Sequence, residues 1–179
     1  MEIIRFEGAF ESFLAQPVKI QYPGQGKKVR SYTPDGLIHF KASLARKPLL
    51  YEVKFRENFR EKWRELMPAF RAAKSYCEGV GWEFRVFTEV EIRTPFLTNA
   101  KFLWPFKDLD ADTAMVKALM SKVDDEAITV EALLDQIEEG DRTLFIPPLW
   151  NLIANRVIHC DLNQTLSLKS LLWAGSNHP

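Results

Sequence analysis

Residues 32–54 read YTPDGLIHFKASLARKPLLYEVK, two apolar runs joined by a basic loop, with Asp35 before the first run and Glu52 after the second. In a strand, residues i and i+2 share a face, so Glu52 and Lys54 point the same way. If the segment at Asp35 pairs with this strand, Asp35 and Glu52 face each other across the ladder. Two adjacent carboxylates repel each other unless a hard cation lies between them, and Mg²⁺ suits one or two carboxylates plus a phosphate.

Two interpretations of this spacing are open. Charged residues mostly lie at the surface, so the stretch can be a solvated strand end. Its context favours a functional site, because Pro34 fixes φ beside Asp35 and an apolar run precedes Glu52. Burial and a neighbouring charge are typical of such sites. We therefore hypothesise a metal-dependent phosphodiesterase site in which Lys54 offers a point charge or a proton acceptor.

The net charge of zero hides an asymmetry between two parts of the chain. Residues 1–107 hold 19 Lys and Arg against 12 Asp and Glu, whereas residues 108–179 hold 5 against 12. A basic part fits a phosphate backbone, which repels an acidic part. The pattern can equally be a dipolar surface with no partner implied. The candidate phosphate contacts are Lys27, Lys28, Arg30, Arg56 and Arg60, of which the first three can instead solvate a hairpin edge.

Length and composition bound the class of protein. A chain of 179 residues supports one large domain or two small ones. Cys77 and Cys160 form no Cys-x-x-Cys pair, which argues against a zinc ribbon or a disulfide framework and favours a reducing compartment. No apolar run approaches the ~20 residues that span a bilayer, and residues 1–13, with three Glu and one Arg, do not look like a signal peptide. We expect a cytoplasmic protein with no membrane partner.

The first 107 residues predict a mixed α/β domain. Apolar spacing of three or four predicts a helix over residues 2–13, although Gly8 weakens it. Three strands follow, at residues 16–22, 29–40 and 49–55, and their short connections predict an antiparallel meander. Residues 57–78 predict a long helix with Trp63 and Phe70 in the core and a kink or break at Pro68. A strand over residues 82–88 should then lie parallel to the third.

The acidic segment 108–112 is the predicted domain boundary, giving domains 1–107 and 108–179. Helices are predicted over residues 113–123, over 129–139 with Thr129 as cap and Gly140 as end, and from Pro147 or Pro148 through Val157. Two strands, 157–162 and 166–173, complete a small winged-helix-like domain. Its third helix offers only Arg156 as a cation, so we favour docking of a protein over DNA.

Several motifs together resemble the TnsA family, the endonuclease subunits of heteromeric cut-and-paste transposases. They are Gln16-Pro17-Val18-Lys19-Ile20, Tyr32-Thr33-Pro34-Asp35, Tyr51-Glu52-Val53-Lys54 and Thr88-Glu89-Val90-Glu91-Ile92-Arg93, in the order and spacing of the family. The similarity covers residues 5–107 well and the tail more loosely. It implies a restriction-endonuclease-like nuclease domain followed by a winged-helix-like domain.

The resemblance also implies an activity and partners. The family hydrolyses DNA at the transposon 5′ ends with Mg²⁺, for which Mn²⁺ can substitute. An integrase-like subunit, TnsB, handles the 3′ ends, and an ATPase regulator, TnsC, is contacted through the C-terminal part. Asp35 and Glu52 would be metal ligands, joined by the backbone carbonyl of Val53, and Lys54 would orient or activate the water or stabilise the phosphate. Such a protein would be bacterial and associated with the nucleoid when assembled.

The chain departs from the family pattern at two positions. A further acidic residue is expected just upstream of the segment matching residues 3–6, and counting back from Phe6 places it before Met1. A truncated start, a reduced ligand set and an inactive, DNA-binding assembly subunit that bridges to the ATPase all remain open. The family's Phe after Pro-Asp is Gly36 here, which we expect to loosen the strand beneath the site, since losing a buried Phe commonly costs about 3–5 kcal/mol.

Overall fold

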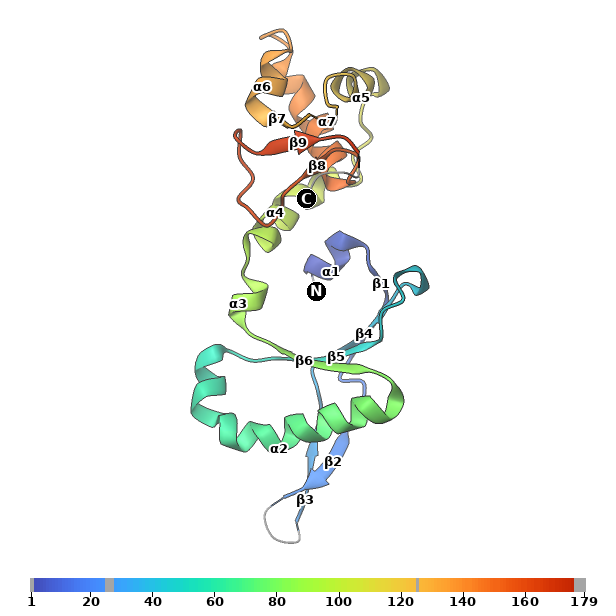
Figure 1. Ribbon diagram of the computed structural model, residues 1–179, viewed down its shortest axis with the longest axis vertical. Helices are drawn as coiled ribbons and strands as arrows, with labels where there is room; N and C mark the ends of the chain where they lie inside the picture. The colour runs from blue at the N-terminus through green and yellow to red at the C-terminus, as the bar shows by residue number, and fades with distance from the viewer. Residues whose placement is uncertain (1, 25–27, 125, 176–179) are drawn as a thin grey trace. The chain divides into compact units, whose positions relative to one another are not determined.

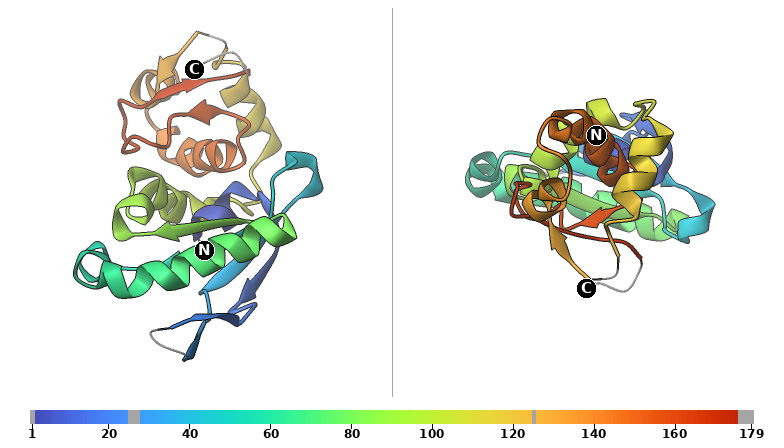
Figure 2. Two further views of the ribbon diagram at one scale, coloured as in Figure 1. Left: turned by 60° about the horizontal axis from the view of Figure 1, so that its bottom comes forward. Right: turned by 90° about the horizontal axis from the view of Figure 1, so that it is seen from above.

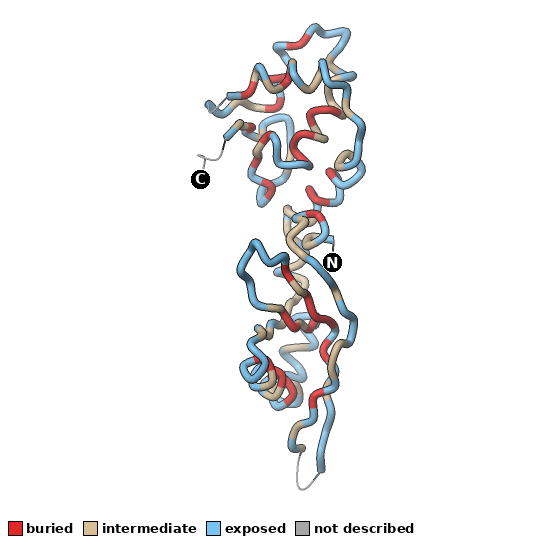
Figure 3. Tube along the Cα trace, turned by 90° about the vertical axis from the view of Figure 1, so that its right-hand side faces the viewer, coloured by how far each residue is buried: buried red, intermediate tan, exposed pale blue. Residues whose placement is uncertain are grey.

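The computed structural model describes residues 2–24, 28–124 and 126–175, and the chain divides into two compact units at Arg93–Thr94 (Figure 1). Buried residues gather in the interior of each unit (Figure 3). No helix in the described ranges is both long and apolar enough to cross a bilayer.

Up to Arg93 the elements are α1 Glu2–Glu7, β1 Phe10–Ala15, β2 Ile20–Pro23, β3 Val29–Tyr32, β4 Gly36–Phe40, the 3₁₀ turn η1 Ala42–Leu44, β5 Leu49–Val53, α2 Arg56–Val80, β6 Glu83–Phe87 and α3 Glu89–Ile92.

The first unit is built on a four-stranded mixed sheet of order β1-β4-β5-β6. β4 pairs antiparallel with β1 and β5, and β6 pairs parallel with β5. The predicted parallel crossover through the long helix is therefore confirmed. β2 and β3 form a separate antiparallel hairpin. A mixed sheet flanked by helices is the architecture expected of a restriction-endonuclease-like fold.

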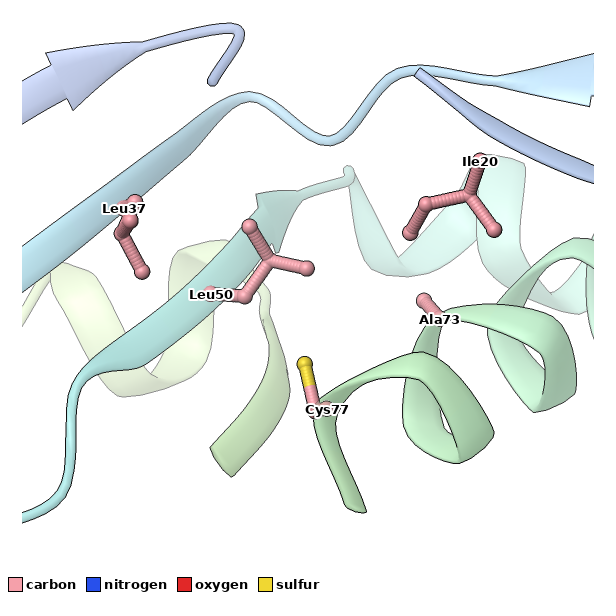
Figure 4. Packing of buried hydrophobic residues seen from close by; sticks show 5 residues of the cluster. All are labelled: Ile20, Leu37, Leu50, Ala73 and Cys77. Atoms are coloured by element: carbon pink, nitrogen blue, oxygen red, sulfur yellow. The ribbon is translucent and has the colours of Figure 1, made fainter. Parts of the chain in front are cut away.

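Strand alternation gives each sheet face its own core. Leu37 and Leu50 point to the face that α2 covers, where they meet Ala73 and Cys77, and Ile20 of β2 closes the cluster (Figure 4). Residues of the opposite parity, among them Ile38 and Leu49, pack on the other face with rings from β1, β5 and β6. The residues that alternate along β4 and β5 thus fill two layers, as a sheet buried on both faces requires.

The predicted helix over residues 2–13 is wrong in its second half. α1 ends at Glu7, Gly8 follows with φ of +64°, and β1 begins at Phe10. A register shift between Phe10 and Ser12 inserts an extra residue into β1. Phe10 and Phe13 can therefore pack in the same cluster although they lie three residues apart. A bulged strand produced the spacing that looked helical.

Two further elements differ from the prediction. The expected strand over 29–40 is divided at Pro34 into β3 and β4, so the three-strand meander becomes a hairpin plus a larger sheet. α2 runs through Pro68 without a break, although its first turns are inclined to the rest in Figure 1. Trp63 is 47% exposed rather than core, because the buried residues of α2 begin only at Ala69.

After Arg93 the elements are α4 Pro95–Leu103, the 3₁₀ turn η2 Trp104–Phe106, α5 Thr113–Met120, β7 Ile128–Thr129, α6 Val130–Asp135, α7 Arg142–Ala154, β8 His159–Cys160 and β9 Leu171–Trp173. The strands form an antiparallel sheet of order β7-β9-β8, as Figure 2 also shows. Thr129 caps α6, as predicted, by accepting from Ala132 N. Pro147 and Pro148 lie inside α7 and do not start it. The winged-helix assignment of this unit stays a prediction.

Contacts divide the chain earlier than the predicted boundary at 107/108. Asn99 is buried, donates through Nδ2 to the carbonyls of Leu162 and Gln164, and accepts from Leu166 N. α4 is therefore tied to the second unit, because a buried amide needs its bonds satisfied. The acidic segment after Lys107 looked like a linker only because its charge stands out in the sequence.

The two cysteines should be inert in the folded protein. Both are free and buried, and burial raises the pKa of each thiol to about 11. The reactive thiolate is therefore scarce at pH 8. We expect Ellman's reagent to label neither cysteine of the native chain and both after unfolding in guanidinium chloride. Fast labelling of native protein that disappears in a Cys77→Ser variant would contradict the position of Cys77 beneath the sheet.

Candidate functional site

The candidate site lies where β5 ends beside the start of β4. The two strands pair Leu37 with Leu50 and Gly36 with Tyr51. Extending this register by one residue sets Asp35 opposite Glu52, the arrangement predicted from the sequence. Asp35 shares its parity with Leu37, and Glu52 with Leu50, so both carboxylates belong to the sheet face that α2 covers.

Asp35 is held by backbone groups on both sides. Its side chain accepts a hydrogen bond from Val53 N at 2.7 Å through Oδ2. Its own carbonyl accepts from Gln16 N at 3.0 Å. Pro34 is buried just before it, whereas Asp35 itself is exposed. The carboxylate is thus anchored at one oxygen while the residue still faces solvent.

Glu52 is a buried charge with both oxygens engaged. The residue is 3% exposed. Lys54 Nζ lies 2.5 Å from Oε1, and the Tyr32 hydroxyl donates to Oε2 at 2.8 Å. A carboxylate out of water is costly unless it is paired and hydrogen-bonded, and these two donors meet that need. Lys54 keeps 32% of its side chain exposed, so it reaches both the buried carboxylate and the solvent.

Tyr32 is a member of this site that sequence reasoning missed. The residue belongs to the motif that ends in Asp35, but nothing in its spacing marks a partner 20 residues away. Burial is the main cause that raises the pKa of Tyr32 far above its usual range, and Glu52 and Asp35 add to it. Burial and the charge of Asp35 also raise the pKa of Tyr51. Tyr32 therefore stays a protonated donor to Glu52 at any ordinary pH.

The donor set of the site fits a hard cation with few protein ligands. Mg²⁺ is commonly held by one or two carboxylates, with water and substrate phosphates completing its shell. Asp35 and Glu52 supply two such carboxylates, and the backbone N–H of Val53, the residue after Glu52, bonds to Asp35. Within the described part of the chain, no group of three or more His, Cys, Asp and Glu side chains forms a ready metal cluster. A cation on Glu52 Oε1 would have to replace the Lys54 ammonium group.

Two acidic residues after β6, Glu89 and Glu91, accept hydrogen bonds that stabilise the structure beside the site. Glu89 accepts from Arg56 N at 2.9 Å in the first turn of α2, and this bond is the main cause that lowers the pKa of Glu89. Glu91 forms a capping box with Thr88, whose hydroxyl and N–H lower the pKa of Glu91. The segment that supplied a family motif therefore fastens α3 to the start of α2, next to Lys54.

The predicted phosphate contacts lie on two separate elements. Lys28 and Arg30 are exposed on the β2–β3 hairpin, which Figure 1 shows extending from the unit. Arg56 and Arg60 are exposed on the first turns of α2, where they line an open hollow with Glu57, Glu61 and Glu89. Lys27 lies outside the described residues. A second hollow, lined by Val53, Lys54, Phe55, Glu89, Ile92 and Arg93, adjoins the candidate site.

Comparison with known protein families supports the resemblance seen in the sequence. Residues 9–89 match the family described as "TnsA-like endonuclease N terminal". The matched segment contains Asp35, Glu52 and Lys54 with the strands that align them. Over residues 9–89 the chain is therefore similar to TnsA-like endonuclease N-terminal domains. No curated protein matches the chain.

Gly36 shows how the TnsA-like domain packs directly beside Asp35. A β-carbon at Gly36 would lie 2.8 Å from Phe13 Cε2 and 2.8 Å from Tyr51 Oη. The rings of Phe13 and Tyr51 thus occupy the space over this residue. The absence of a larger side chain at Gly36 therefore leaves no void on this side of β4.

We expect Gly36→Ala to lower the free energy of unfolding by about 1–3 kcal/mol, the usual cost of overpacking. Gly79→Ala is the control, because nothing lies within 4 Å of a β-carbon at that helical position. It should raise stability by about 0.5–1 kcal/mol. Urea unfolding followed by circular dichroism measures both. Equal free energies of unfolding for the two variants would show that the rings of Phe13 and Tyr51 move aside for the added methyl group at no cost in stability.

Proposed function

We propose that the chain is a Mg²⁺-dependent DNA endonuclease subunit of a heteromeric transposase, which hydrolyses phosphodiester bonds at transposon 5′ ends. The TnsA-like domain indicates a transposase-type nuclease, and the remainder is our proposal. One observation carries it: the β4–β5 register aligns Asp35 with the buried Glu52, which is paired with the partly exposed Lys54 at a strand end. A solvated strand end would leave its carboxylates in water, whereas Glu52 is buried and bonded to an ammonium group.

The proposed reaction adds water across one phosphodiester bond. A water oxygen bonds to phosphorus, the bond to the leaving oxygen breaks, and that oxygen gains a proton. Asp35, Glu52 and the Val53 carbonyl would hold Mg²⁺, which supplies positive charge to polarise the phosphodiester and the attacking water. Lys54 reaches solvent from its buried partner, so its ammonium group can stabilise charge on the phosphate or orient the water.

Partners are proposed from the same resemblance and from charge. TnsB would act at the 3′ ends, and the acidic part of the chain from residue 108 would dock the ATPase TnsC. The second unit is proposed to be winged-helix-like because its order from α5 to β9 is helix, strand, helix, helix, strand, strand. The assembled protein would work in the bacterial cytoplasm at the nucleoid.

A second candidate is a non-catalytic assembly subunit that keeps the nuclease fold, binds DNA and bridges to the ATPase. One observation favours it: the described residues bring together two carboxylates at the site and no cluster of three. The two candidates differ in whether Asp35 and Lys54 are needed for strand cleavage.

Strand nicking with Mg²⁺ or Mn²⁺, in the presence of the partner transposase subunit, tests the proposal. Asp35→Asn, Glu52→Gln and Lys54→Met should each slow nicking at least 100-fold, the scale of losing a positioned acid–base or electrostatic group. Arg85→Met and Glu83→Gln are matched controls, because these residues form an exposed i, i+2 ion pair on β6. The controls should nick like the wild type.

Nicking by the Asp35 and Lys54 variants at the wild-type rate would show that the assigned site is wrong. A wild type that nicks nothing with its partners present, yet binds DNA, would favour the assembly subunit.

Salt dependence tests the proposed DNA contacts independently of cleavage. Each phosphate contact contributes about 0.9 to the slope of log K against log salt on duplex DNA. We expect Lys28→Ala and Arg60→Ala each to flatten the slope by about that amount, measured by fluorescence anisotropy. Lys117→Ala, on an exposed position of α5, should leave it unchanged. A wild-type slope near zero would contradict phosphate contacts altogether.

A further inference from the structure

Tyr32 is fixed in place by contacts that do not involve the candidate site. It ends β3, where it pairs with Ile20, a buried member of the core beneath α2. Its ring packs edge-on against Phe70 of α2, with centroids 5.9 Å apart. Backbone pairing on one side and an aromatic contact on the other leave the ring little freedom. The hydroxyl is therefore presented to Glu52 from a rigid support.

The orientation of the Glu52 carboxylate depends on the Tyr32 hydroxyl more than on the ion pair with Lys54. Its Oε1 bonds Lys54, whose four-carbon stem is flexible and partly exposed. Its Oε2 bonds Tyr32 at 2.8 Å. The terminal torsion of a glutamate is broad, so a buried carboxylate with one mobile partner has no single orientation. The Tyr32 bond supplies the fixed direction.

The two partners of Glu52 also respond differently to an incoming cation. A divalent ion repels the Lys54 ammonium group but exerts no such net repulsion on a neutral hydroxyl. The Tyr32 bond can persist when Lys54 turns to solvent or to a phosphate. Oε1 is then the oxygen open to the ion, and Oε2 remains the oxygen that sets the carboxylate plane.

We propose that Tyr32 is a positioning residue for the metal-binding carboxylate Glu52, an inference that rests on the proposed function. It touches neither the cleaved bond nor the ion and acts through Glu52. Donors that orient metal-binding carboxylates in this way typically account for a 10–100-fold difference in metal affinity or activity when they are removed.

Tyr32→Phe tests the inference because it keeps the ring against Phe70 and removes only the hydroxyl. The full chain is titrated with Mn²⁺, and bound ion is measured from the loss of the free-ion electron paramagnetic resonance signal. We expect the Kd for Mn²⁺ to rise about 10-fold or more. Tyr22→Phe is the matched control, because it removes a hydroxyl from the facing strand of the same hairpin and leaves the Glu52 bond intact. Its Kd should equal that of the wild type.

The outcomes distinguish failure of the positioning role of Tyr32 from failure of the proposed metal site. If the wild type binds Mn²⁺, Glu52→Gln abolishes binding and Tyr32→Phe binds like the wild type, the positioning role is overturned while the metal site stands. If the wild type binds no Mn²⁺, or Glu52→Gln changes nothing, the proposed site itself fails and the role of Tyr32 with it. A merely structural role would lower the melting temperature of Tyr32→Phe without changing its Kd. In nicking assays the positioning role predicts a lower kcat with an unchanged KM for DNA.

Discussion

The antiparallel register of β4 and β5 is the constraint on which the rest of the first unit depends. It places Leu37 and Leu50 together beneath α2. A slip of one residue would turn every side chain of a strand to the opposite face. Burying a leucine contributes about 1.5–3 kcal/mol, so the core resists such a slip strongly. The same register continues to Asp35 and Glu52, and the packing that stabilises the sheet therefore also aligns the two carboxylates.

This coupling explains what could be predicted. The period of two in a strand is local, so it correctly placed Glu52 and Lys54 on one face, where they form an ion pair. A long helix between two neighbouring strands is the crossover connection that parallel pairing requires, so the parallel pairing of β5 and β6 also followed. The candidate site could be predicted because its residues lie at the ends of strands that the sequence pattern had already indicated.

What could not be predicted depends on contacts between distant segments. The bulge in β1 exists only against β4, and without that partner the spacing of Phe10 and Phe13 is indistinguishable from a helix. Trp63 lies on the apolar stripe of α2 but precedes the buried residues of the helix, which begin at Ala69. Tyr32 bonds Glu52 only because the β2–β3 hairpin docks on α2. In each case the missing information is the position of a partner far along the chain.

Charge balance links the structure to the proposed chemistry. Asp35 and Glu52 carry two negative charges, and Lys54 compensates one of them. The folded chain can hold this single excess charge because Asp35 is exposed and accepts the Val53 N–H. A divalent cation would reverse the sign of the site, and a phosphodiester, with one negative charge, would then restore neutrality. Lys54 would be released toward that phosphate by the ion that displaces it from Glu52. If the proposed metal and DNA bind here, the Glu52–Lys54 pair would stabilise the buried carboxylate before they bind, and Tyr32 would hold that carboxylate in one orientation both before and after.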